Sequence, residues 1–216
     1  MGEAYQIVAF VDLEDAAMLH TAKRVIRWMH DERIRGDALA PEESPEARLR
    51  PWFEAVGYDE ARIQLELAKA RNRFKQRIAF APGERATEAM TASPESPSHP
   101  HASTGIELVM GWNIHGDARW GYAGHCPTCH RQVSNLHLRG GPLMLAAAKL
   151  ESDPRSPLVC VDCGAESPLR SWSFDPTLLV SPLALRFANW RPLRTSFLEA
   201  LATVVGGRVR TTSEVL

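Results

Sequence analysis

The chain has 216 residues, of which 44% are hydrophobic and 24% charged, a composition typical of a globular protein with a sizeable core. Its 25 basic and 26 acidic residues give a formal net charge of −1, so no overall field favours nucleic acid or an anionic membrane surface. The N-terminus has neither a basic region nor a long apolar run, and no later segment is apolar over the length of a membrane span. We therefore expect a cytoplasmic protein whose cysteines stay reduced.

The first 81 residues are expected to form an α/β part. Residues 5–10 (YQIVAF) form a short run rich in strand-forming residues. Residues 12–33 then show apolar side chains at three- and four-residue steps, which predicts an amphipathic helix. Asp12 is the expected N-cap, and the helix should fade near residues 35–36.

The middle of the chain carries weaker signals. Residues 37–52 (DALAPEESPEARLRPW) are acidic and typical of a loop, and residues 58–80 begin with helical spacing and end in a strand-like QRIAF. Residues 82–104 are rich in Pro, Ser, Thr, Ala and Glu, with little to bury. We predict a flexible linker or long surface loop at 82–104, which separates the first part from a second part at 105–216.

The second part is predicted to alternate strands and helices around a cysteine-rich stretch. The clearest helix spans residues 196–205, with Ser196 as N-cap and Glu199 at the capping-box position. Gly206 and Gly207 should end it. The other expected elements are a strand at 106–114, a helix at 142–151, two strand sections within 178–190 separated by Pro182, and a closing strand at 208–216.

All four cysteines occur in two Cys-x-x-Cys pairs, Cys126/Cys129 and Cys160/Cys163. Two residues between thiols let both sulfurs point at one ion, and two such turns supply the tetrahedral four-sulfur shell typical of Zn²⁺. The 30 residues between the pairs exceed the usual spacing. The longer loop costs roughly 0.5 kcal/mol in closure, which is small beside the roughly 10 kcal/mol of structural zinc binding.

The residues after each pair also suit metal-binding turns. Gly164 follows Cys163, at a position where a positive φ is often needed, and His130 takes the matching position in the first pair. Four thiolates complete the coordination shell, so the predicted four-cysteine zinc ribbon is structural and has no open catalytic position. We read His125, His130 and His137 as surface residues or as neighbours of the ligands.

Two other interpretations of the first cysteine pair are weaker. Cys-Pro-Thr-Cys-His is also a haem-attachment pattern, but that reading requires export and leaves Cys160 and Cys163 unexplained. A redox dithiol is expected at a helix N-terminus, whereas the residues after the first pair (HRQVSNLHLRGG) form helix poorly.

The sequence contains no recognisable catalytic set. It has no nucleophile elbow, no phosphate-binding glycine loop and no assignable triad, so we expect a protein that is not an enzyme. Four tryptophans in the second part could stack on nucleic-acid bases or pack a core or a protein interface. Since there is no basic excess, packing is favoured for Trp112, Trp120, Trp172 and Trp190.

Four segments of the second part carry a family resemblance: WGYAGHCPTCH, LVCVDCGAE, SWSFDP and LRFANWRPLRTSFLEALATVVGGRVRTTSEVL. They resemble a loosely defined group of small bacterial zinc-ribbon proteins with two cysteine pairs, an Asn-Trp-x-Pro-Leu segment, a Phe-led helix and a closing strand. The match covers roughly residues 106–216 and departs from the group where Gly206-Gly207 replaces Gly-His. Several members are thought to be immunity proteins of polymorphic-toxin or type VI secretion systems. The resemblance carries over the four cysteines and implies a toxin partner.

Together these observations predict an α+β protein with a mixed sheet, flanking helices and an inserted four-cysteine zinc ribbon, in which both parts can share one sheet. The expected function is that of a non-enzymatic, protein-binding protein with structural Zn²⁺, an immunity protein that covers the active site of a toxin. The alternative is a zinc-ribbon protein that binds nucleic acid in transcription. An enzyme with a structural zinc is the third hypothesis.

Overall fold

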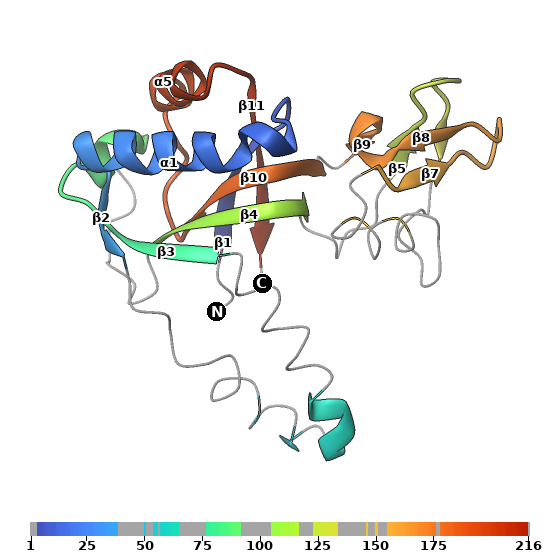
Figure 1. The fold of residues 1–216 in the computed structure, drawn as a ribbon, viewed down its shortest axis with the longest axis horizontal. Coiled ribbons are helices and arrows are strands. Elements are labelled where there is room, and N and C mark those ends of the chain that lie inside the picture. The colour runs from blue at the N-terminus through green and yellow to red at the C-terminus, as the bar shows by residue number, and fades with distance from the viewer. Residues whose placement is uncertain are drawn as a thin grey trace.

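The computed structural model describes residues 4–38, 50, 54–55, 57–64, 77–91, 105–116, 123–133, 146, 150, 155–175 and 178–215. Its body is a six-stranded sheet with the strand order β11-β1-β10-β4-β3-β2 (Figure 1). The strands are β1 (Ala4–Phe10), β2 (Arg35–Ala38), β3 (Arg77–Pro82), β4 (Gly105–His115), β10 (Leu179–Ala188) and β11 (Val209–Val215). Every neighbouring pair in this sheet is antiparallel, so the α+β class is confirmed but the sheet is not mixed.

Strands from both ends of the chain build this sheet. β1 lies between β10 and β11, with Ile7 opposite Arg186 on one side and Thr212 on the other. β3 pairs with β4, which joins the N-terminal strands to the opposite side of the sheet. Residues before 82 and after 105 therefore share one sheet.

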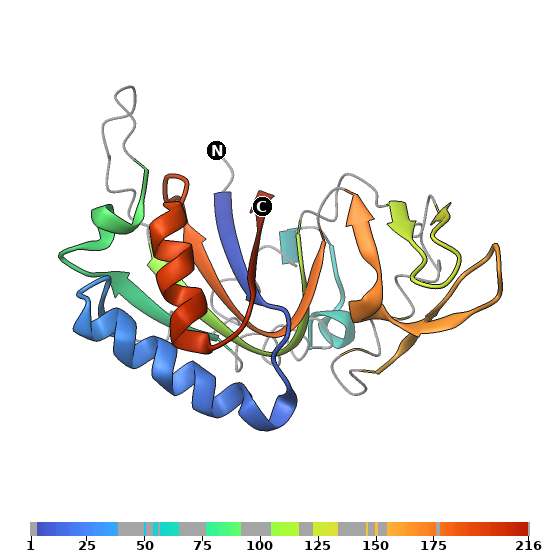
Figure 2. The same cartoon turned by 90° about the horizontal axis from the view of Figure 1, so that it is seen from above.

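Two helices, α1 (Asp15–Asp31) and α5 (Thr195–Val205), lie on the same face of the sheet (Figures 1 and 2). Arg24 of α1 donates a hydrogen bond to the carbonyl of Val204 near the end of α5. The core between helices and sheet centres on Phe187, which is fully buried and whose ring centroid lies 4.9 Å from that of Trp190 and 6.0 Å from that of Phe197. Burial of this apolar face holds the helices on the sheet.

Both helices begin differently from the sequence expectation. α1 has Glu14 at its N-cap, and the expected cap, Asp12, instead accepts two hydrogen bonds from Arg208 at 2.7 and 2.8 Å. These bonds lower the pKa of Asp12. Arg208 reaches Asp12 because β11 begins beside the end of β1, a contact between residues far apart in sequence.

α5 begins one residue before the expected cap, so Ser196 lies inside the helix. Arg194 takes the N-cap position, and its backbone N–H donates to the carbonyl of Ala89. This tertiary contact fixes where the chain turns into the helix. At the other end the prediction is confirmed, because Gly206 has φ 69° and ends the helix in the left-handed conformation.

Pro182 does not divide β10 as predicted. Residues 179–188 form one strand that is buried along its whole length, with a register shift between Ser181 and Leu183. Proline cannot donate to the ladder, and a bulge is the position in a sheet that accommodates this loss. Ser181 Oγ donates to the Leu183 carbonyl at 2.9 Å across the bulge.

The expected linker is partly structured. Residues 86–89 form a short 3₁₀ helix, η1, in which Ala86 and Ala89 are buried, and Met90 bridges to Leu193. The first residues of the predicted linker or loop thus contact the rest of the fold, whereas residues 92–104 lie outside the described residues. The predicted loop at 37–52 and helix at 142–151 also lie mostly outside them.

The Asn-Trp-x-Pro-Leu segment is held by the first strand. Asn189 has φ 56°, its backbone N–H donates to the Ala4 carbonyl, and its side-chain oxygen accepts from the Ala4 N–H. The Gln6 amide donates to the carbonyls of Trp190 and Arg191 and accepts from the Leu193 N–H. Asn189 and the backbone of the segment are thus fixed against β1.

Replacing Gln6 by alanine is expected to lower the free energy of unfolding by roughly 2 kcal/mol, since three half-buried hydrogen bonds are lost. Urea denaturation followed by circular dichroism measures this change. Gln64→Ala is the matched control, because among the described residues the Gln64 side chain bonds only to the exposed Glu60, and its loss should change stability little. Equal effects of both substitutions would contradict the anchoring role.

Candidate metal centre

Beside the six-stranded sheet, short hairpins carry the two cysteine pairs (Figure 1). The first hairpin consists of β5 (Ala123–His125) and β6 (Gln132–Val133), and the second of β7 (Pro157–Val159) and β8 (Glu166–Pro168). β9 (Ser173–Asp175) pairs with β5. Each cysteine pair lies in the turn of one hairpin.

The two turns have the same backbone hydrogen bonds. The N–H of Cys126 donates to the carbonyl five residues later at 3.1 Å, and that of Cys160 does the same at 3.0 Å. The carbonyls of these cysteines accept from the N–H four residues later, at 2.9 and 2.8 Å. The repeated geometry places two thiols on one side of each turn.

Both turns also need a residue with positive φ. His130 has φ 58° and Gly164 has φ 71°, as the aligned sequence positions predicted. A left-handed conformation costs a non-glycine residue roughly 1–2 kcal/mol, whereas glycine adopts it freely. The first turn therefore stores strain that the second does not.

His130→Gly is expected to raise the melting temperature of the metal-loaded hairpins, because it should raise their free energy of unfolding by up to about 1 kcal/mol. Gly164→Ala should lower it by a comparable amount, because alanine would have to adopt the positive φ. Thermal unfolding followed by tryptophan fluorescence tests both. Destabilisation by both substitutions would show that the His130 side chain stabilises the turn by other contacts.

The structure brings all four predicted ligands together. Their Sγ atoms lie within 4.8 Å of one another, with Cys126 3.9 Å from Cys163 and Cys129 3.8 Å from Cys160. Four sulfurs around an ion with bonds of about 2.3 Å lie roughly 3.8 Å apart in a tetrahedron. The four cysteines can therefore hold a metal ion.

The pKa shifts of Cys126 and Cys163 support the fit to a cation. At Cys126 burial opposes the thiolate, but the N–H groups of Cys129 and Thr128 and the neighbouring thiols outweigh it and lower the pKa to about 6. At Cys163 the Ala165 N–H favours the thiolate, whereas desolvation and the other three thiols raise the pKa to about 12. One thiolate thus suppresses the next, and a bound cation relieves this repulsion.

The cluster lies half inside an apolar core. Cys126 and Cys160 are buried, Cys129 is half-buried and Cys163 is exposed. The buried pair packs in a cluster with residues such as Leu158, Leu169, Trp172 and Phe174. Among the described residues, neither His125 nor His130 belongs to the group of ligand atoms, and His137 lies outside those residues.

Trp112 links this core to the body of the protein. It lies on β4, packs in the same apolar cluster, and donates its indole N–H to Asp15 at the start of α1. The guanidinium of Arg170, in the short helix η3 (Leu169–Ser171), lies 5.7 Å from its ring centroid. Of the four tryptophans considered above, Trp112, Trp172 and Trp190 are buried, which confirms the packing interpretation for them, and Trp120 lies outside the described residues.

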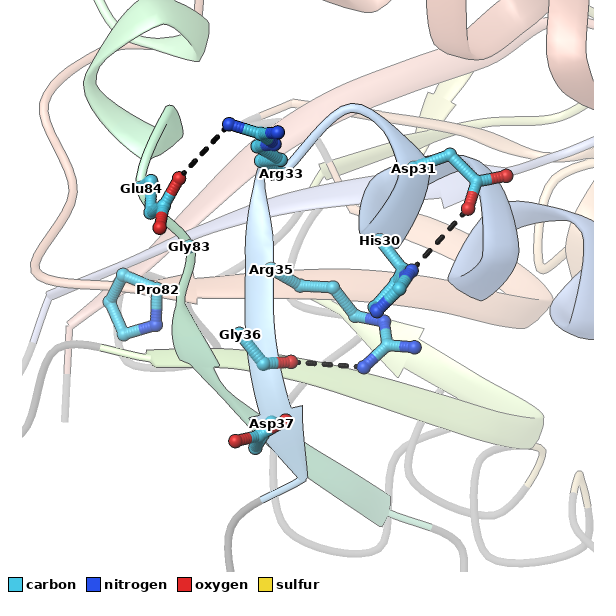
Figure 3. A pocket seen from close by; sticks show the side chains of 9 residues that line it. All are labelled: His30, Asp31, Arg33, Arg35, Gly36, Asp37, Pro82, Gly83 and Glu84. Atoms are coloured by element: carbon cyan, nitrogen blue, oxygen red, sulfur yellow. Dashed lines mark hydrogen bonds and ion pairs between the residues drawn. The ribbon is translucent and has the colours of Figure 1, made fainter.

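A second concave feature lies at the β2 edge, with a volume of about 560 Å³ (Figure 3). Arg33 pairs with Glu84 and His30 with Asp31, both at 3.3 Å. Arg35 stacks over Phe80 at 4.7 Å and donates to the carbonyls of Ile26 and Gly36. The lining is thus of mixed charge, formed by His30, Asp31, Arg33, Arg35, Gly36, Asp37, Pro82, Gly83 and Glu84.

The sequence did not reveal this groove, because β2 (RGDA) has four residues and none that favours strands. A short β2 forms because its backbone pairs with β3, where Arg35 lies opposite Pro82. Neither a propensity nor a spacing signal marks such a strand in advance.

Fold and site together define an α+β protein with a pair of hairpins whose four cysteines can bind a metal ion. Comparisons with protein-family models, with curated proteins and with solved structures found no match. Within the described residues, no helix combines the length and the apolarity needed to span a membrane.

Proposed function

We propose that the protein is a non-enzymatic binding protein whose two hairpins are held together by structural Zn²⁺. The observation that carries the metal assignment is the spacing of 3.8 and 3.9 Å between sulfurs of opposite hairpins. An all-sulfur tetrahedral set favours zinc or iron over Mg²⁺, Ca²⁺ and Mn²⁺, and four thiolates leave no open position for substrate. A reducing compartment such as the cytoplasm would keep these thiols available to the metal.

The proposed partner is a protein, and the resemblance of residues 106–216 to immunity proteins suggests a secreted toxin. Two exposed apolar side chains on the second hairpin support a contact surface there. Val161, between Cys160 and Cys163, is 66% exposed, and Val159 of β7 is 43% exposed. A metal-braced turn presents such side chains rigidly, which reduces the entropy lost on binding. Binding would inhibit the toxin by covering its active site.

Co-expression with the product of the neighbouring gene tests this function. We expect the protein to protect cells from that product and to form a complex with it in solution. Val161→Asp should weaken the complex, because a charge replaces an apolar contact. Leu19→Asp is the matched control, since Leu19 is an apolar side chain of similar exposure (55%) on α1, outside the two hairpins, and should leave binding unchanged.

If the protein gives no protection and forms no complex, the immunity function is refuted. Salt-sensitive binding to DNA or RNA would instead favour the alternative of a nucleic-acid-binding ribbon, because phosphate contacts release counterions. Metal content is measured on the same samples, so failure of the partner hypothesis is separable from failure of the zinc assignment.

A further inference from the structure

The last strand of the six-stranded sheet, β11, lies at its edge. Among the described strands its only partner is β1, with Thr212 opposite Ile7 (Figure 2 shows β11 beside β1). An edge strand of seven residues presents a row of backbone donors and acceptors that can pair with another strand. Which strand fits this edge depends on the residues whose backbone N–H and C=O groups point away from β1.

The hydrogen bonds of β1 identify those outward residues. Ala4 exchanges hydrogen bonds with Asn189, so the backbone groups of Ala4 face β10. Since these groups alternate along a strand, those of Ile7 face β11, and those of Thr212 opposite it face β1. The backbone groups of the alternate residues therefore point away from the sheet, and Thr211 and Ser213 among them are exposed. The outward set is Val209, Thr211, Ser213 and Val215.

The sequence of β11, VRTTSEV, is complementary to itself when read in the opposite direction about Thr212. In that register Val209 lies opposite Val215, Arg210 opposite Glu214, and Thr211 opposite Ser213 of the second strand. Opposite charges and matched polar residues across an antiparallel pair are stabilising. We propose that two copies of this chain pair antiparallel through β11, about a two-fold axis at Thr212.

The backbone geometry supports the same register. The outward residues meet as hydrogen-bonded pairs, and four such pairs with two bonds each give about eight hydrogen bonds between the copies. The positions of Arg210 and Glu214 then meet as non-hydrogen-bonded pairs, where opposing side chains lie closest. Two-fold symmetry produces this charge match twice.

Other registers between the two copies of β11 give fewer opposite-charge pairs or fewer backbone hydrogen bonds. A shift by two residues places Arg210 opposite Thr212 or beyond the strand, and leaves one end valine without a strand partner. A shift by one residue sets outward backbone groups against inward ones, which removes the hydrogen bonds. Within the described residues Arg210 has no ion pair or hydrogen bond of its side chain, so its charge is available to a second copy.

Light scattering after size exclusion, with sedimentation velocity over a range of concentrations, tests the dimer. Thr211→Pro removes one outward N–H and no hydrogen bond to β1, so it should give a folded monomer. Arg210→Glu or Glu214→Arg alone places like charges opposite each other at both sites and should raise the dimer Kd by about tenfold or more. The double variant R210E/E214R restores opposite charges and should restore the dimer.

Arg27→Glu, on the exposed side of α1, is the matched charge control and should leave the dimer unchanged. Circular dichroism confirms that each variant is folded. A wild-type protein that stays monomeric at every concentration would overturn the proposal and leave the edge to a strand of another protein. A dimer that survives Thr211→Pro, or one that the double variant does not restore, would also overturn it.

Discussion

Replacing Cys160 by serine is expected to abolish stoichiometric metal binding and to unfold both hairpins, while the six-stranded sheet stays folded. Cys160 is buried and faces Cys129 of the other hairpin, so its loss breaks the connection between them. The effect should be large, because structural zinc contributes on the order of 10 kcal/mol. The sheet survives because its own core cluster draws none of the described residues between 116 and 178.

Elemental analysis of the purified protein measures the metal, with one zinc per wild-type chain expected. Hydrogen exchange then localises the unfolding, which should be confined to residues 123–133 and 155–175. Val161→Ser is the matched control, since it places serine in the same turn without removing a ligand. A full complement of metal in Cys160→Ser would exclude the four-cysteine site.

Phe187→Ala is expected to lower the free energy of unfolding of the sheet by roughly 3–5 kcal/mol. Phe187 is fully buried on the central strand β10, with its ring centroid 4.9 Å from that of Trp190 and 6.0 Å from that of Phe197. Its removal leaves a cavity beneath α5 that the sheet cannot close. Urea denaturation followed by far-ultraviolet circular dichroism measures the change.

Phe174→Ala provides a matched comparison in the other core. Phe174 packs with the metal-binding hairpins, so its loss should destabilise them and leave the urea midpoint of the sheet nearly unchanged. Phe187→Leu keeps most of the buried volume and should cost less than about 1.5 kcal/mol. Equal effects of Phe187→Ala and Phe174→Ala on the sheet would show that the two clusters unfold as one unit.

The four-cysteine cluster was predictable because its signal is local. Two residues between thiols fix the geometry of each turn, and the positive φ of His130 and Gly164 follows from their equivalent positions. The sequence also predicts that the two turns lie together, because each turn carries two thiols and a tetrahedral shell around one ion takes four. Apolar periodicity similarly located α1, and capping signals with Gly206-Gly207 located α5, each to within a few residues.

The features that were missed depend on contacts between distant residues. Asp12 looked like a helix cap, but Arg208 arrives beside it only when β11 pairs with β1. Pro182 looked like a strand break, but the bulge against β4 accommodates it. The order of the six strands has no local signal, since β1 pairs with β10 about 180 residues later and with β11 about 200 residues later.

The position of the hairpins in the chain has a consequence for the order of folding. Residues 116–178 lie between β4 and β10, whose ends are paired with His115 opposite Leu179. Once these two strands meet, the ends of the intervening segment are already together, which removes much of the entropy of bringing the two cysteine turns into contact. We therefore expect the sheet to form first and the metal ion to bind last, to a segment whose two ends are already held together by β4 and β10.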